Sequence, residues 1–229
     1  MNKENLNIQL DIATLAQLPV FEGYSEKKVE TILSSIDYSL QSIPKGTVVA
    51  LQNSICAHLY LLLEGSLEVH IVDICGNNIK IEDIVGPREF ATPHLFDRNN
   101  KFPATFRARI NSLLLKIPKN IVFNLFATEP AFLKNFLQVM SSCNACTACR
   151  LKVLSFKNIR SRFVYYLLDR KTDDNVSYLG HNQTQLAEYI GVSRPALAKE
   201  IKKMIDEKLI EICDKKVKLL AFPSLLQYV

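Results

Sequence analysis

The sequence has no apolar run long enough to cross a membrane, since its longest clusters, in HLYLLLEG and NSLLLKIP, are far too short. Its first residues lack a basic segment followed by an apolar run, so we expect no export signal. No Cys/His/Asp catalytic order, nucleotide-binding loop or paired-acid motif is present, which argues against an enzyme. The six cysteines are unevenly spaced, as in reduced proteins rather than disulfide-framed ones. These absences favour a cytoplasmic protein that is not an enzyme.

Basic residues are concentrated in the last third of the chain. From Arg150 onward there are 15 Lys and Arg against 9 Asp and Glu, a net charge of +6. Residues 1–149 carry the other 13 basic and 14 acidic residues, a net charge of −1. This asymmetry indicates a nucleic-acid-binding segment attached to a neutral one. A solvated lysine-rich face is the alternative that charge alone leaves open.

The first half of the chain has the pattern of short helices followed by short strands. Residues 14–36 show the apolar spacing of two amphipathic helices, with Ser25 suited to cap the second. Strand-like runs then follow at 47–51, 59–72, 78–85, 104–110 and 112–118. Four of the seven glycines lie in the turns between them. Several short strands with regular turns predict a β-roll or barrel.

A long helix is predicted over residues 130–156, with Pro130 in its first turn. Its apolar residues recur at alternating three- and four-residue steps, a narrow seam suited to pairing with a second copy of the helix. The seam comprises Phe132, Phe136, Val139, Met140, Cys143, Cys146, Arg150 and Leu154.

Residues 182–208 have the pattern of a helix-turn-helix. Asn182 and Ser193 are suited to cap its two helices, and Gly191 permits the tight turn between them. Leu186, Ala187 and Ile190 are predicted to be buried in the first helix, and Leu197, Ile201, Met204 and Ile205 in the second.

The outer face of the second helix carries Arg194, Ala198, Lys199 and Lys202. Such a helix would enter the major groove of double-stranded DNA, where Arg194 and Lys199 could donate to guanine acceptors. Asn182 and Ser193, at the helix starts, would suit phosphate oxygens. After it, LIEICDKKVKLLAF alternates like a hairpin whose tip, with Lys215 and Lys216, would form a basic wing. A helical hairpin without a DNA role is the alternative.

These motifs resemble the cyclic-AMP receptor / fumarate–nitrate regulator (Crp/Fnr) superfamily of bacterial transcription factors. The resemblance covers nearly the whole chain and is most specific in KNIRSRFVYYLL followed by TQLAEYIGVSRPALAKEI. It implies an α+β protein with an effector-sensing β-roll of the jelly-roll type over 1–128. It further implies a dimerisation helix over 129–156 and a winged helix-turn-helix over 157–229. A homodimer paired through residues 130–156, with DNA and RNA polymerase as partners, is also implied.

Two stretches depart from the family. Cyclic-nucleotide-binding members carry Gly-Glu, then Arg with Ser or Thr before Ala, where this chain has Ala91-Thr92 and Phe102-Pro103. A phosphodiester would meet a ring and an imide there, so the sequence argues against cyclic AMP. In the second helix, Pro195 replaces a common Glu and Lys199 a common Arg, which predicts a different DNA site.

Cys143, Cys146 and Cys149 recur at three-residue steps along the long helix. They could be small packing residues, metal ligands or redox-active thiols, and Arg150 would favour a thiolate at Cys149. Members that bind iron–sulfur clusters have cysteines near the N-terminus, whereas this chain has none before Cys56.

The cofactor is therefore left open between none, an iron–sulfur cluster, zinc, and haem with His94 as a ligand. The leading hypothesis is a dimeric transcription regulator controlled by an effector other than cyclic AMP. The alternatives are a metal- or thiol-based redox sensor that uses the cysteine helix, and a constitutive DNA-binding protein with a vestigial sensor.

Overall fold

A computed structural model describes residues 10–72, 76, 78–172 and 174–229, without the side chains of 78, 79 and 144–147. The Cys146 side chain lies outside the described part, as does Cys75, which could join the long-helix cysteines as a further metal or cluster ligand. The chain divides into two compact units, residues 1–143 and 144–229, each described separately below. None of the described helices is both long and apolar enough to cross a membrane.

Short helices begin the first unit, as the spacing in residues 14–36 predicts. They are α1 (Ile12–Ala16), a 3₁₀ turn η1 (Pro19–Phe21) and α2 (Glu26–Ser34). The predicted cap of α2 is confirmed, because Ser25 Oγ accepts a 3.3 Å hydrogen bond from the Lys28 amide. Val29, Ile32 and Leu33 are buried on the inner face of α2.

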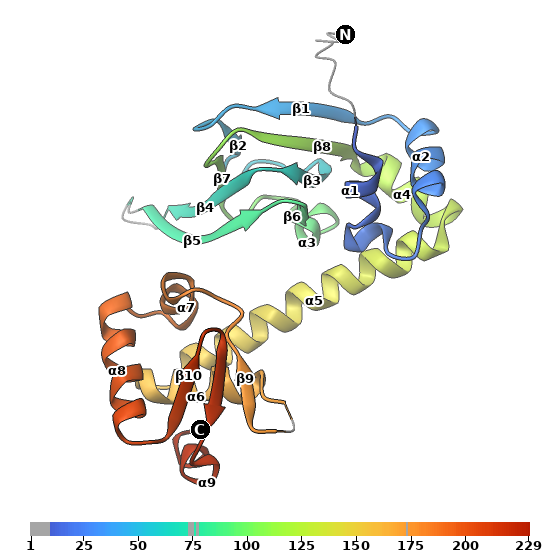
Figure 1. The fold of residues 1–229 in the computed structure, drawn as a ribbon. Helices are drawn as coiled ribbons and strands as arrows, with labels where there is room; N and C mark the ends of the chain where they lie inside the picture. Colours follow the sequence, from blue (N-terminus) through green and yellow to red (C-terminus); the bar gives the residue numbers. More distant parts are fainter. Residues whose placement is uncertain (1–9, 73–75, 77, 173) are drawn as a thin grey trace. The chain divides into compact units, whose positions relative to one another are not determined.

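Two antiparallel four-stranded sheets form the β-roll (Figure 1). One sheet has the order β1-β8-β3-β6 and the other β2-β7-β4-β5. The strands are β1 (Ser39–Ile43), β2 (Val48–Ala50), β3 (His58–Glu64), β4 (Ser66–Val72), β5 (Asn78–Val85), β6 (Arg88–Phe90), β7 (Thr105–Ala108) and β8 (Ser112–Pro118). A four-residue helix, α3 (Thr92–Leu95), lies between β6 and β7. Every predicted run contains a strand, while β1 and β6 were not predicted.

β3 is buried on both faces, which explains its nearly continuous apolar run. Leu59, Leu61 and Leu63 contribute to a core that also contains buried residues of the helices. Tyr60 and Leu62 point the other way, into the interior of the roll. At the β3–β4 turn, Gly65 has a φ of +98°, and a Cβ there would overlap Ser112.

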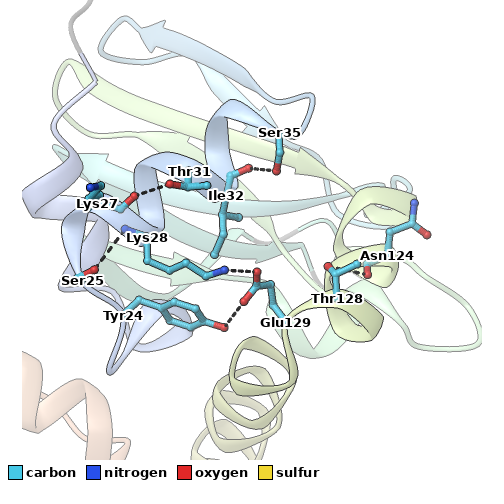
Figure 2. Close-up of polar contacts among 10 residues, drawn as sticks. All are labelled: Tyr24, Ser25, Lys27, Lys28, Thr31, Ile32, Ser35, Asn124, Thr128 and Glu129. Atoms are coloured by element: carbon cyan, nitrogen blue, oxygen red, sulfur yellow. Dashed lines mark hydrogen bonds and ion pairs between the residues drawn. The ribbon is translucent and has the colours of Figure 1, made fainter.

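α4 (Lys119–Thr128) and α5 (Pro130–Ser155) are separated by Glu129. Figure 2 shows how this residue is held: Lys28 Nζ lies 2.6 Å from one carboxylate oxygen, and the Tyr24 hydroxyl donates to the other at 3.5 Å. Pro130 occupies the first turn of α5, where its missing amide costs no helical hydrogen bond. The start of α5 is therefore tied to the N-terminal helices.

The prediction that α5 pairs with a second copy through its apolar seam is wrong for the first half of that seam, residues 132–139. Phe132, Phe136 and Val139 are 0%, 2% and 8% exposed, because they are buried in the core of their own unit. Asn135 on the same side is also buried and donates to the carbonyl oxygens of Val20 and Glu22, at 3.3 and 2.8 Å. This face is therefore not available to a second copy of the helix.

The second unit contains the end of α5 and a three-stranded antiparallel sheet of order β10-β11-β9. Its other elements are α6 (Ile159–Asp169), β9 (Val176–Tyr178), α7 (Gln183–Ile190), α8 (Arg194–Asp206), β10 (Ile210–Cys213), β11 (Lys216–Leu219), α9 (Phe222–Leu225) and η2 (Leu226–Tyr228). β9 lies in the polar stretch KTDDNVSYLGHN (171–182), for which the sequence predicts neither helix nor strand. It completes the sheet by pairing with β11.

Candidate DNA-binding surface

α7 begins at a reciprocal cap. The Gln185 amide donates to Asn182 Oδ1 at 2.9 Å, and the Asn182 amide donates to Gln185 Oε1 at 3.0 Å. The helix ends at Gly191, which has a φ of +70°, a conformation that a residue with a Cβ rarely adopts. Leu186 and Ile190 are buried, as predicted. Residues close in sequence thus set both ends of the first helix and the turn.

α8 also begins as the sequence predicts. Ser193 Oγ accepts from the Ala196 amide at 3.3 Å, and Pro195 lies in the first turn. Three of the four residues predicted to be buried in α8 are buried, namely Leu197, Ile201 and Met204. The fourth prediction is wrong, since Ile205 is 41% exposed and lies beyond the edge of the buried stripe.

The outer face of α8 is basic and exposed. Arg194, Lys199 and Lys202 are all exposed, with Ala198 between them. Within the described residues, none of these three cations forms an ion pair. Their donors are therefore available for a ligand that carries negative charge or acceptor atoms.

The predicted hairpin is formed by β10 and β11, with a two-residue turn at Asp214 and Lys215. Asp214 has a φ of +54°, which short polar side chains tolerate best after glycine. Lys215 and Lys216 are exposed, although Lys216 is the first residue of β11 and not part of the turn. Lys218, which lies two residues further along β11, is also exposed.

Several arginines of the basic segment point inward. Arg162 donates to the Phe156 carbonyl at 2.9 Å and to the Ile190 carbonyl at 3.0 Å, which ties the end of α7 to the α5–α6 connection. Arg150 donates to the Glu188 carbonyl at 3.2 Å. The net charge of +6 therefore overstates how basic the exposed surface is. The sequence around these arginines does not distinguish them from exposed arginines.

In the first unit, the interior of the roll is filled by aromatic rings where the family's nucleotide cassette is expected. Phe102 is 2% exposed, and its ring centroid lies 5.3 Å from that of Tyr60 and 5.6 Å from that of Phe106. Its backbone is held on both sides: its amide donates to the Ser54 carbonyl at 2.9 Å, and its carbonyl accepts from the Asn53 amide at 2.8 Å.

The residues around Phe102 differ in charge from the family's nucleotide cassette. Thr92, at the position of the expected acid, is 2% exposed with an unpaired hydroxyl, and Pro103 has no amide hydrogen to donate. Arg107 on β7 could in principle replace the cassette's cation, but it is 46% exposed and donates to the Gly46 carbonyl. None of Thr92, Phe102 and Pro103 carries a charge that could pair with a phosphate.

Cys149 on α5 does not show the predicted activation. Cys149 Sγ donates to Asp169 at 3.3 Å, and burial together with this contact raises the pKa of the thiol. Arg150 does not favour a thiolate there, because its guanidinium reaches the Glu188 carbonyl. Cys143 is half-buried. Among side chains that the structure describes, no three His, Cys, Asp or Glu are grouped to hold a metal ion.

Comparison with known proteins gives one matching family model in each of the two units. The family model described as cyclic nucleotide-binding domain matches residues 40–129, and that described as Crp-like helix-turn-helix domain matches residues 161–228. A sequence search of curated proteins finds no match. A cyclic nucleotide-binding-type roll followed by a Crp-like helix-turn-helix is the fold of Crp/Fnr-type transcription regulators.

Solved structures have the same fold over most of the chain. The catabolite activator protein of Thermus thermophilus has a TM-score of 0.55 at 20% identity, covering 92% of this chain and 97% of that chain. A CooA mutant from Carboxydothermus hydrogenoformans has 0.61 at 17%, covering 90% and 91%. CLP of Xanthomonas campestris, a c-di-GMP responsive global regulator, has 0.56 at 19%, covering 86% and 100%. The chain belongs to the Crp/Fnr superfamily, as its motifs predict.

Proposed function

We propose that this protein is a homodimeric, sequence-specific DNA-binding regulator of transcription that acts in the cytoplasm and is not an enzyme. The observation that carries the proposal is the two-sided α8. Leu197, Ile201 and Met204 fix one side in the core, while Arg194, Lys199 and Lys202 are exposed without ion-pair partners in the described chain. A helix anchored in this way can present donors to base edges in the major groove.

Each side chain proposed to contact DNA has a hydrogen-bond donor for that contact. Arg194 and Lys199 would read guanine O6 and N7, and Lys202 would reach a phosphate. The caps accept hydrogen bonds within the protein, so the Ser193 hydroxyl and the Asn182 amide group can still donate to phosphates. Lys215 and Lys216 on the wing would add contacts to the DNA backbone.

The dimer would form through the exposed side of α5 rather than the predicted seam. Leu137 is 53% exposed and lines an open groove with Leu133, Ser141 and Glu22. Leu151, at helical spacing further along the sequence, is 64% exposed. Exposed leucines at this spacing favour pairing of two α5 helices.

The proposed regulator responds to an effector other than cyclic AMP, since Phe102 fills the roll where the nucleotide would bind. Iron–sulfur, zinc or haem binding, with Cys143, Cys146, Cys149 or His94 as ligands, stays a prediction. Any effector must favour one arrangement of the two α5 helices over another to change DNA affinity. RNA polymerase is the further partner we propose, by resemblance to the family.

Binding of full-length protein to DNA tests this function. A duplex is selected from a random pool by the wild-type protein, and affinity is measured by fluorescence anisotropy for this duplex and a scrambled one. Arg194→Ala with Lys199→Ala should weaken specific binding by about tenfold or more, because each good base contact contributes about 1–3 kcal/mol. Lys27→Ala, an exposed charge on α2, serves as the control.

The wing provides an internal comparison. Lys215→Ala with Lys216→Ala should weaken binding to both duplexes alike, because phosphate contacts carry no sequence information. Unchanged specific binding by the Arg194/Lys199 variant would refute the groove contacts.

A further inference from the structure

Arg160, in the first turn of α6, links three elements of the second unit. Its Nε lies 2.6 Å from Glu200 on α8, and its two terminal nitrogens lie 2.6 and 2.9 Å from the carboxylate oxygens of Glu207. It also donates to the Tyr228 hydroxyl at 3.1 Å, with the guanidinium 5.3 Å from that ring's centroid. Such a bidentate, stacked arginine has a fixed orientation.

The two glutamates, one on α8 and one at its C-cap, are about two helical turns apart. Glu200 is in the middle of the helix and Glu207 follows its last residue. A single planar guanidinium that bonds both therefore holds α8 at two points along its axis, which resists both tilting and rotation about that axis. Arg160 and Glu200 are only 16% and 18% exposed, so solvent competes little for these bonds.

We propose that Arg160 is a positioning residue for DNA recognition: it touches no base but fixes the angle at which α8 presents Arg194 and Lys199. This assignment rests on the function proposed above. Sequence readout by hydrogen bonds depends on angle and distance, whereas attraction to phosphates tolerates small displacements. Loss of Arg160 should therefore reduce specific binding far more than non-specific binding.

A competing explanation for weaker DNA binding without Arg160 is that Arg160 neutralises the charge of Glu200 and Glu207. Without the guanidinium, Glu200 and Glu207 would be unpaired carboxylates on the helix that faces DNA, with Lys203 the other cation near Glu207. Their repulsion of phosphates would weaken binding whatever the helix angle. A variant that removes all three charges separates the two causes.

The experiment uses the full-length protein and the selected and scrambled duplexes. Arg160→Met should weaken specific binding by about tenfold or more while non-specific binding changes less than about threefold. Adding Glu200→Gln and Glu207→Gln should not restore specific binding. Arg160→Lys should recover only part of it, because a lysine cannot form the bidentate contact. Arg98→Met, an exposed arginine on the roll, is the charge-matched control.

Other results would overturn the assignment. Specific binding by Arg160→Met that stays within about threefold of wild type, an equal loss on both duplexes, or full recovery in the triple variant would each do so. If Arg160→Met does not fold by circular dichroism, Glu207→Gln decides, since it breaks the bidentate pair at a carboxylate that is 46% exposed. It should lower specific binding alone, and no change would refute positioning. A wild-type protein without any preferred sequence would instead refute the proposed function, and the assignment with it.

Discussion

At the scale of single residues, Phe102 is the clearest difference between this roll and those of nucleotide-binding family members. The family resemblance places an arginine at this position in nucleotide-binding members, whereas here a ring is packed against Tyr60 and Phe106. The Phe102 amide donates to the Ser54 carbonyl and its carbonyl accepts from the Asn53 amide, so the backbone that carries the ring is held on both sides. Position 102 therefore contributes a packed ring to the roll, where nucleotide-binding members have a cation that pairs with a phosphodiester.

Phe102→Ala should lower the free energy of unfolding by about 3–5 kcal/mol, because it removes a buried ring and leaves a cavity. Urea denaturation followed by circular dichroism measures this loss. Phe123→Ala on α4 is the matched control, since that ring is 65% exposed and its removal should cost less than about 1 kcal/mol. A loss of similar size in both variants would show that Phe102 does not fill the roll.

At the scale of elements, the helix-turn-helix could be predicted from sequence and the partner of α5 could not. The ends of α7 and α8 depend on bonds between residues three apart, such as Asn182 with Gln185, so a local pattern suffices to find them. α5 has apolar residues on more than one side. Which side is covered by its own chain depends on distant segments, such as the Val20 carbonyl that Asn135 contacts.

The short strands show the same limit of local patterns. β1, β6 and β9 have the sequences SLQSI, REF and VSY, whose polar residues hide the strand pattern that the apolar VVA of β2 shows. They are strands because neighbouring strands pair with them, as β11 does with β9. Arg160 was likewise missed, because its partners Glu200 and Glu207 are far from it in sequence.

Leu137→Glu should convert the proposed dimer to monomer, because a two-fold axis through this contact would place a carboxylate from each copy in the apolar surface. Sedimentation velocity over a concentration series should show a dimer dissociation constant raised by at least about tenfold. Leu51→Glu, a similarly exposed leucine on the roll at 59%, should leave the dimer intact. A dimer that tolerates Leu137→Glu would place the contact on another surface.

At the scale of the whole molecule, the roll and the winged domain have different physical characters. The roll-bearing residues 1–149 are almost neutral at −1, and the winged domain is basic even after its inward arginines are discounted. Such a distribution confines DNA attraction to one part of the chain. A dimer of this chain would carry two recognition helices, so its DNA site should have two related halves.

The most direct test is to recover genomic fragments bound by the full-length protein and to map the protected bases by nuclease footprinting. We expect one preferred sequence with two-fold-related half-sites, about 10 base pairs or a multiple of that apart, because each protomer places α8 in a major groove on the same face of the duplex. Recovery of fragments with no common sequence would contradict a role in sequence-specific DNA recognition.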